Sequence, residues 1–368
     1  MVEFHVGGRS IRTGNPLVLL TVIVVGVMVL HMFWMLLVED SIQFNRVATL
    51  LWDGFMRGLL IGLAGIGLSM TYSILNFANF AHGDYITSGA FVGWGVTYLI
   101  AGFGTADWGD LLLAGTGNVY GPQLGIGITQ SPVAIVIGLV LAGGATVAIA
   151  LLVDRYVYRS MRDVGGIPLL IASVGVAFAL RYVIAFVYTQ TNRGTTTADK
   201  VPGWDIFVVD GTFDVGGHDL TLLVAVVGLM LGVHLLLQRT KLGKAMRAMS
   251  DNKDLALVTG IPAERVIRWT WIIGGALTGV AGYLVVLWRG TLTFQFGWLL
   301  LLLIFAAVIL GGIGSVYGAI FGGIVIGLTM SLSQLWIPTD FARAAAFAVM
   351  ILILLVRPAG IFAGRTTA

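Results

Sequence analysis

The sequence has 368 residues, of which 58% are hydrophobic and only 11% are charged, and its formal net charge is +3. Soluble domains carry about 25% charged residues, so this composition argues against a soluble enzyme, a disordered scaffold and a nucleic-acid-binding protein. The absence of cysteine excludes disulfides, cysteine–zinc sites and a catalytic thiol. The 51 glycines are about twice the usual share, which is typical of closely packed membrane helices.

Ten stretches of the chain approach the ~20 apolar residues that a membrane-spanning helix needs. They predict an all-α polytopic membrane protein with about ten transmembrane helices. In chain order, the predicted spans are residues 17–38, 56–75, 84–103, 131–153, 167–188, 220–238, 268–288, 298–312, 316–336 and 343–357. The first apolar run is longer than the core of a signal peptide, so we expect a membrane anchor. Residues 39–55 have apolar side chains at helical spacings, which predicts an interfacial helix before the second span.

Lysine and arginine residues predict the orientation of these spans. If both termini are cytoplasmic, 14 of the 21 lie in inner segments, six lie in outer segments and Arg181 lies within a span. This bias follows the positive-inside rule. The two long outer segments are 104–130 and 189–219, and the second is rich in aspartate. We interpret them as solvated loops or, alternatively, as a docking surface for an extracellular partner.

The longest inner segment, residues 239–267, has the pattern of two short helices. One apolar face of the first helix holds Leu242, Met246 and Met249. Ser250 or Asp251 is expected to cap the second helix at its N-terminus, and Gly260 is expected to end it. A small-residue face of the second helix holds Leu255, Ala256 and Thr259. Such a helix suits docking into a groove of another protein, and an ordinary amphipathic loop is the alternative.

Four motifs resemble those of one transporter family. Residues 247–261 have the pattern R-A-x-x-x-N-x-x-x-A-x-x-x-G-I, which resembles the coupling loop of ABC-importer permeases. The motifs NFAHGD at 79–84, LGGIGSVYGA at 310–319 and RPAGIF at 357–362 resemble signatures of branched-chain amino-acid ABC permeases. They occur in family order, so the chain is identified as a member of this family, which also includes urea and amide permeases.

The resemblance implies one permease subunit of a high-affinity importer in a prokaryotic cell (inner or plasma) membrane, and not an enzyme. Residues 1–45 would be an N-terminal extension with the first transmembrane helix, and 46–364 the ABC permease transmembrane domain. Residues 239–267 would be a cytoplasmic coupling loop within that domain. The implied partners are two ATP-binding subunits, a second related permease (hetero- or homodimer), an external solute-binding protein and the lipid bilayer, with no nucleic acid.

In such an importer, ATP binding and hydrolysis are expected on other chains. No G-x-x-x-x-G-K-[ST] phosphate-binding motif occurs in this sequence. We therefore expect no cofactor on this chain, and ATP and Mg in the partner subunits.

The motifs and the spans indicate three groups of candidate residues. Coupling to the ATPase is implied for Arg247, Ala248, Asn252, Ala256, Gly260 and Ile261. The translocation path or its gate is predicted to include Asn79, His82, Gly83, Asp84 and Arg181. Close helix packing or a tight turn is predicted at Gly311, Gly312, Gly314 and Gly318. No catalytic or metal-binding residues are expected.

Each membrane group has an alternative interpretation. The NFAHGD motif could be a capped turn that holds two helices together, because a helix break at membrane depth must be buried in protein or line a cavity. The glycine motif could contact the solute directly. Arg181 lies in the outer half of its span and could instead snorkel outward or form a structural pair. Asp84 is expected at the opposite depth, so it is not expected to pair with Arg181.

The predicted function is therefore a path for branched-chain or other aliphatic amino acids, driven by separate ATP-binding subunits. The alternatives are a urea or short-chain amide ABC permease and a stand-alone secondary carrier or channel. A membrane enzyme would need a convergent catalytic cluster, which five dispersed histidines do not suggest. Bulky side chains at Gly260 or Ala256 are expected to uncouple transport from ATP hydrolysis.

Overall fold

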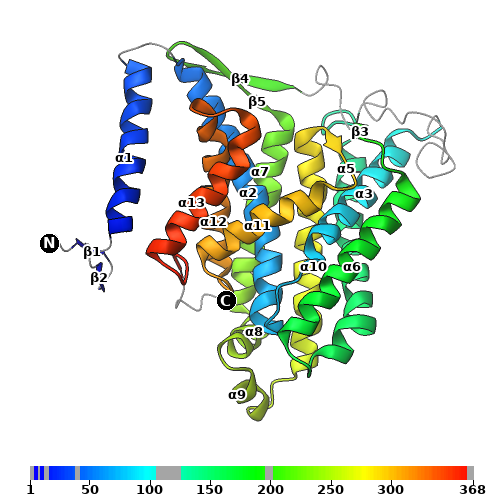
Figure 1. Ribbon diagram of the computed structural model, residues 1–368. Helices are drawn as coiled ribbons and strands as arrows, with labels where there is room; N and C mark the ends of the chain where they lie inside the picture. Colours follow the sequence, from blue (N-terminus) through cyan, green and yellow to red (C-terminus); the bar gives the residue numbers. More distant parts are fainter. Residues whose placement is uncertain are drawn as a thin grey trace.

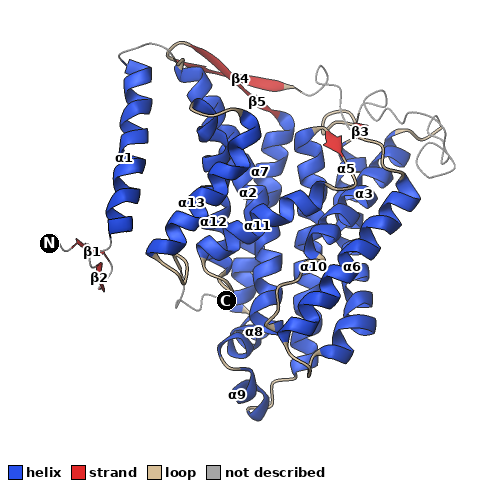
Figure 2. Cartoon of the chain, viewed as in Figure 1, coloured by secondary structure: helices blue, strands red, loops and turns tan. Residues whose placement is uncertain are grey.

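Long helices make up most of the protein, and short strand pairs lie at the ends of the helical bundle (Figure 1, Figure 2). The computed structural model describes residues 4–6, 9–11, 16–37, 42–104, 126–194 and 202–362. The long helices are α1 Pro16–Leu37, α2 Phe44–Leu75, α3 His82–Ala101, α5 Pro132–Val153, α6 Gly166–Tyr188, α7 Gly217–Arg239, α10 Ala263–Arg289, α11 Phe296–Gly311, α12 Val316–Leu332 and α13 Ala342–Val356.

Shorter elements connect these helices. A π-helical turn and a 3₁₀ turn extend α5, and two short helices separate α7 from α10; these elements are Asp154–Tyr158, Arg159–Met161, α8 Lys241–Asp251 and α9 Lys253–Val258. Further 3₁₀ turns before α13 are Ser333–Leu335 and Thr339–Phe341. Three antiparallel pairs join β1 Phe4–Val6 with β2 Arg9–Ile11, β3 Arg193–Gly194 with β6 Thr291–Leu292, and β4 Gly203–Val208 with β5 Gly211–Gly216.

Each of the ten predicted spans coincides with one long helix. Seven helices in the described part are long and apolar enough to cross a membrane: α2, α5, α6, α7, α10, α12, and α13 with the turn before it. The prediction of a mostly helical, polytopic membrane protein is therefore confirmed. The count of about ten crossings stays a prediction, because α1, α3 and α11 are not among these seven.

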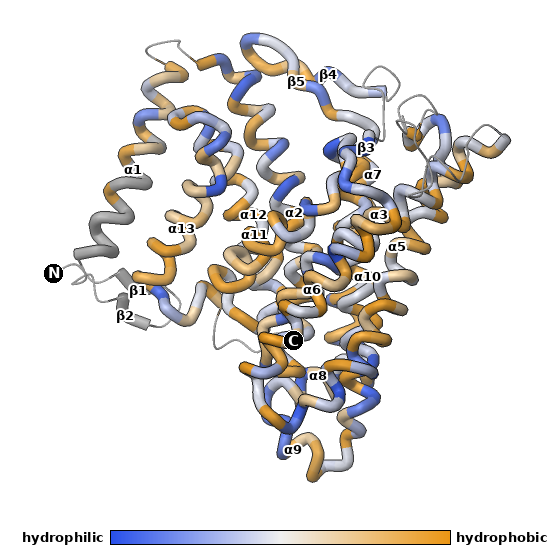
Figure 3. Tube along the Cα trace, turned by 45° about the vertical axis from the view of Figure 1, so that its right-hand side comes forward, coloured by the Kyte–Doolittle hydropathy of each residue, from blue (hydrophilic) through white to orange (hydrophobic). Residues whose placement is uncertain are grey.

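The short elements α8, α9, β4 and β5 lie at two opposite ends of the bundle. In Figure 1, α8 and α9 form the lower end, whereas β4 and β5 lie across the upper end. Figure 3 shows hydrophilic residues around both ends and hydrophobic residues along the helices between them. Helices at the periphery expose apolar side chains such as Phe186, Val224 and Ile351, as helices in contact with lipid do.

Helices α2 and α12 pack closely through glycine. A Cβ added at Gly58 would lie 2.6 Å from the Ile324 Cα, and one added at Gly323 would lie 2.7 Å from the Gly58 carbonyl oxygen. Side chains at these positions would therefore collide with backbone. This is the small-x-x-x-small contact of membrane helices, and it fixes α2 in the centre of the bundle.

The interfacial helix predicted for residues 39–55 is wrong, because α2 runs without a break from Phe44 to Leu75. The Asp210 carboxylate, in the turn between β4 and β5, accepts the backbone N–H groups of Phe44 and Asn45 at the start of α2. The Trp52 indole N–H donates to Asp219 at 3.1 Å. Two acidic residues of the segment predicted to be outer, Asp210 and Asp219, therefore hold the start of α2. The interpretation of this segment as purely solvated does not apply to them.

Candidate functional site

The NFAHGD motif reverses the chain inside the bundle. Helix α2 ends at Leu75, and Asn76 takes a left-handed conformation with φ 55°. The Phe80 backbone N–H then donates to the Ser173 Oγ at 3.0 Å. Ser173 is the eighth residue of α6, about 10 Å along that helix at 1.5 Å per residue. Helix α3 therefore starts well inside the bundle and not at its lower end.

This reversal brings Asp84 and Arg181 together. The Arg181 Nε and Nη2 groups donate to the two carboxylate oxygens of Asp84 at 3.0 and 2.9 Å. Asp84 is fully buried and Arg181 is 8% exposed. The guanidinium also lies 4.7 Å from the ring centroid of Trp298 and 5.3 Å from that of Phe178. The result is a bidentate, desolvated ion pair backed by cation–π contacts.

The expectation that these two residues lie at opposite depths is wrong. It assumed that the third span begins at the membrane surface, whereas α3 begins about two turns along α6, near Ser173. Snorkelling of Arg181 toward the outer surface is also wrong, because its guanidinium is fixed on Asp84. An intramembrane charge with a named partner is a candidate functional feature.

The other members of the motif hold the start of α3 in place. The Asn79 Oδ1 accepts the Ala81 backbone N–H at 3.1 Å and the Tyr158 hydroxyl at 3.2 Å. The His82 ring Nε2 lies 3.0 Å from the Ala64 carbonyl oxygen of α2. A Cβ at Gly83 would lie 2.7 Å from the Gly297 carbonyl oxygen of α11. Asn79, His82 and Asp84 are all buried, so they form an interior cluster in this conformation.

The LGGIGSVYGA motif forms the tight turn between α11 and α12, where Gly312 and Gly314 have φ of 106° and 87°. A side chain is strained in this region. The Ser315 Oγ accepts the Gly318 N–H at 3.0 Å and caps α12. The Ile361 N–H of the RPAGIF motif donates to the Leu310 carbonyl at 2.9 Å. Two motifs far apart in sequence therefore meet in one turn.

The inner segment 239–267 contains α8 and α9, as its pattern predicts. Met246 and Met249 are buried against the bundle. The cap of α9 is Asn252, whose Oδ1 accepts the Leu255 N–H at 2.9 Å; neither Ser250 nor Asp251 plays this part. Asp251 is the last residue of α8, so the next residue, Asn252, takes the N-cap position of α9. Its side-chain oxygen accepts the hydrogen bond that an N-cap needs to accept.

Helix α9 ends at a Schellman motif. The Gly260 N–H donates to the Leu257 carbonyl and the Ile261 N–H to the Ala256 carbonyl, both at 3.0 Å, with Gly260 at φ 83°. Of the small-residue face predicted for α9, Leu255 and Thr259 are exposed, but Ala256 is buried against the bundle. Most of the exposed apolar surface is aliphatic and comes from Leu255, Leu257 and Val258, the last 86% exposed.

The six predicted coupling residues all lie in or beside α8 and α9. Asn252 and Gly260 are exposed, Arg247, Ala248 and Ile261 are half-buried, and Ala256 is buried. Arg247 also donates to the Gln238 side chain at 3.4 Å. The segment thus offers a polar surface with an aliphatic tip, held to the bundle by its inner side.

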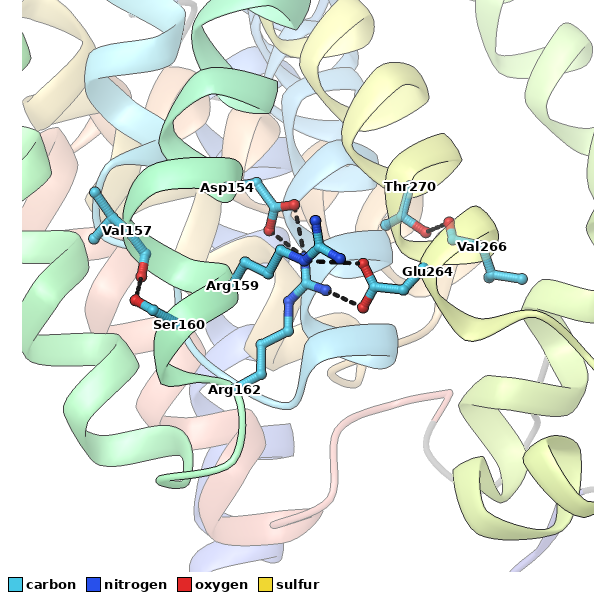
Figure 4. A network of polar contacts seen from close by, with 8 residues as sticks. All are labelled: Asp154, Val157, Arg159, Ser160, Arg162, Glu264, Val266 and Thr270. Carbon is cyan, nitrogen blue, oxygen red and sulfur yellow. Dashed lines mark hydrogen bonds and ion pairs between the residues drawn. The ribbon is translucent and has the colours of Figure 1, made fainter.

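An ion-pair network that the sequence did not reveal ties the end of α5 to the start of α10 (Figure 4). Arg162 Nη2 donates to both Asp154 carboxylate oxygens at 2.6 Å, and Arg162 Nη1 donates to Glu264 Oε1 at 2.6 Å. Arg159 lies 3.6 Å from Glu264. Glu264 follows α9 by only a few residues, so movement of α9 would reach α5 through Arg162.

The members of this network should differ in their contribution to stability. The Asp154 and Arg162 side chains are about one-tenth exposed, whereas that of Glu264 is 57% exposed. We expect Arg162→Lys to cost about 1.5–3 kcal/mol, because lysine has one donor nitrogen and cannot reach Asp154 and Glu264 from two separate nitrogens. We expect Glu264→Gln to cost less than about 1 kcal/mol. Thermal unfolding of the two variants in the same lipid nanodiscs checks this order, and equal effects would contradict it.

Comparison with known proteins identifies the family. Residues 50–354 match the family described as branched-chain amino acid transport system / permease component. The chain belongs to this permease family. It is therefore a multi-pass membrane protein and a transport subunit, not an enzyme.

Several curated relatives of this permease share most of its length. It is 28% identical over 327 residues to the high-affinity branched-chain amino acid transport system permease protein LivH of Escherichia coli K12, covering 87% of this chain and 97% of the relative. It is 26% identical over 311 residues to BraD of Pseudomonas aeruginosa, covering 84% and 93%. It is 28% identical over 309 residues to a probable LivH of Methanocaldococcus jannaschii, covering 82% and 88%. No solved structure gave a significant match.

Proposed function

We propose that this permease forms the translocation path for branched-chain or other aliphatic amino acids in an ABC importer. The family match across residues 50–354 carries this proposal, together with relatives named for branched-chain amino acid transport. Two ATP-binding subunits supply the energy and hold ATP and Mg, and an external solute-binding protein delivers the solute. A second permease, identical or related, completes the path.

The proposed topology has ten crossings with both termini in the cytoplasm of a prokaryotic cell. The charge bias of the sequence supports it, as does the position of α8 and α9 at one end of the bundle with β4 and β5 at the other (Figure 1). The α8–α9 segment then faces the ATP-binding subunits, and the β4–β5 hairpin faces the external binding protein. The proposed N-terminal extension is 1–45 and the proposed permease domain is 46–364, which the family match over residues 50–354 supports.

The proposed gate is the Asp84–Arg181 ion pair. An unpaired charge in the path would bind a zwitterion too tightly for transport. The charges of a closed path must therefore be neutralised. The pair does this, because each charge neutralises the other in the interior. Asn79, His82 and Gly83 position the first turn of α3 and thereby the Asp84 carboxylate. Gly311, Gly312, Gly314 and Gly318 position the far end of α11.

Reconstitution tests the proposed function. The permease, its partner permease, the ATP-binding subunits and the binding protein are placed in proteoliposomes, and uptake of labelled leucine is measured with ATP inside. We expect ATP- and binding-protein-dependent leucine uptake, with excess valine and isoleucine competing and urea not competing. Urea uptake without leucine uptake would contradict the proposal, and uptake without ATP-binding subunits would indicate a stand-alone carrier.

The aliphatic tip of α9 gives a prediction for coupling. Val258→Asp is expected to lower ATP-driven uptake on the order of tenfold, because a charge would be buried where the ATP-binding subunit covers the tip. Val164→Asp is a matched control, since Val164 is 65% exposed in the turn after α5 and lies outside α8 and α9. Co-purification of the ATP-binding subunits and uptake are measured for both. Equal uptake by the two variants would contradict the coupling role.

A further inference from the structure

A cavity of about 500 Å³ opens at the end of the bundle opposite α8 and α9. Its walls come from α2, α10, α11, α12, α13 and the 3₁₀ turn before α13. Arg289, Asp340 and Arg343 are exposed at its mouth, whereas Leu60, Ile61 and Leu303 line it as buried residues. Its volume lies within the ~300–1,000 Å³ of small-molecule sites.

Three guanidinium groups converge on this cavity, from Arg57, Arg289 and Arg343, against one lining carboxylate, Asp340. Arg57 is half-buried and lies 5.8 Å from the ring centroid of Trp288. Asp53, Arg289 and Arg343 all act on it electrostatically, and Asp53 acts most strongly of the three. Three guanidinium groups against the carboxylates of Asp53 and Asp340 still leave an excess of positive charge, which favours an anion.

These arginines differ from the inward-facing arginines elsewhere in the protein. Arg162 and Arg181 each hold a carboxylate of this chain within 3.0 Å. Within the described ranges, no ion pair involves Arg57, Arg289 or Arg343. Their donors suit a carboxylate in bidentate geometry. Asp53, one turn before Arg57 on α2, attracts Arg57 electrostatically but forms no ion pair with it.

Most of the remaining lining is apolar, although Thr293, Gln334 and Thr339 also contribute to it. Leu60, Leu299, Leu300, Leu303 and Met330 form an apolar wall below the arginines. A ligand that satisfies both regions has a carboxylate next to a short hydrocarbon chain, and an ammonium group could face Asp340. An α-amino acid with an aliphatic side chain has all three features, whereas urea has neither the carboxylate nor the hydrocarbon chain.

Helix α11 connects the cavity to the buried ion pair. Leu299, Leu300 and Leu303 of α11 line the cavity, while Trp298 of the same turn contacts the Arg181 guanidinium on another face of the helix. A ligand that displaces the first turns of α11 would therefore also move the aromatic support of Arg181. The cavity and the proposed gate lie on two sides of one short helix.

We propose that this cavity is the site where the permease receives the solute from the outside, and that it recognises an aliphatic α-amino acid. The guanidinium groups of Arg57, Arg289 and Arg343 hold the carboxylate, and the leucine and methionine side chains hold the hydrocarbon chain. Arg57, the deepest of the three, makes the main contact. This inference rests on the proposed function and adds to it the residues that recognise the solute.

Saturation-transfer NMR tests the site on the permease–ATPase complex in nanodiscs, without the binding protein. The probes are leucine, leucinamide (which lacks the carboxylate) and urea. We expect methyl signals from leucine, at least tenfold weaker binding of leucinamide and none of urea. Arg57→Gln should weaken leucine binding about tenfold and remove the preference for leucine over leucinamide. A change that only loosened the fold would weaken both ligands equally.

Two further variants complete the test. Arg343 is exposed at the mouth of the cavity, so the fold should tolerate Arg343→Gln. This variant should weaken the binding of leucine more than the binding of leucinamide. Arg268→Gln, on the exposed start of α10, should leave binding unchanged. If both cavity variants bind leucine as the unaltered complex does, the inference is wrong, even if the complete importer carries leucine. Failure of the complete importer to carry leucine would overturn the proposed function itself.

Discussion

Arg181→Ala is expected to lower the stability of the permease by about 3–5 kcal/mol, because it leaves the Asp84 carboxylate buried without a counter-ion. Asp84 is fully buried and receives both of its short side-chain contacts from Arg181. Asp84→Ala should cost somewhat less, since the guanidinium would keep its contacts with Trp298 and Phe178. Thermal unfolding in nanodiscs measures both effects.

A double variant shows whether the Asp84–Arg181 ion pair only stabilises the fold or also closes the path. Removing both side chains leaves no unpaired charge, so Asp84→Ala with Arg181→Ala should recover most of the lost stability. We expect this stable double variant to remain defective in ATP-driven uptake, because the charges that close the path are gone. Normal uptake by it would assign the pair to folding alone.

The matched control for these variants is Arg268→Ala, which removes an exposed arginine and should change stability by less than about 1 kcal/mol. If Arg181→Ala were no more harmful than Arg268→Ala, the guanidinium would have to reach water by snorkelling. In that case the ion pair would not contribute to the folded state.

Features set by local chemistry could be predicted from the sequence. Long apolar runs placed all ten long helices, because a buried or lipid-facing helix must be apolar along its length. Gly260 ends α9 as expected, since the left-handed residue of a Schellman motif is a requirement of the local backbone. The tight turn at 312–315 follows the same logic, with two glycines at positive φ.

Features that depend on distant segments could not be predicted in this way. The depth of Asp84 depends on how far residues 76–81 turn back into the bundle, which the length of an apolar run does not encode. Arg57, Arg289 and Arg343 come from three separate outer segments, and a count of outer charges hides their convergence on one cavity. The spacing of small residues in α9 also did not predict that Ala256 faces the bundle, because tertiary packing decides which side of so short a helix is buried.

Gly58→Ala is expected to destabilise the permease by about 1–3 kcal/mol, although alanine is normally the better helix former. The added Cβ would lie 2.6 Å from the Ile324 Cα and 2.9 Å from the Gly323 carbonyl oxygen. Both are backbone atoms, so no side-chain rotation relieves the collision and α2 must move away from α12. Gly58→Val should have a larger effect, because two further methyl groups meet the same backbone.

The control for Gly58 is Gly228, a glycine of α7 whose added Cβ would meet no atom within 4 Å. Gly228→Ala should be neutral or should stabilise by up to about 1 kcal/mol, because alanine loses less backbone entropy in a helix. Opposite signs of the two shifts in unfolding temperature would distinguish close packing from helix propensity. Equal shifts would mean that α2 and α12 do not touch. Since Arg57 adjoins Gly58, separation of α2 from α12 should also displace its guanidinium, so Gly58→Ala should lower leucine uptake while Gly228→Ala leaves it unchanged.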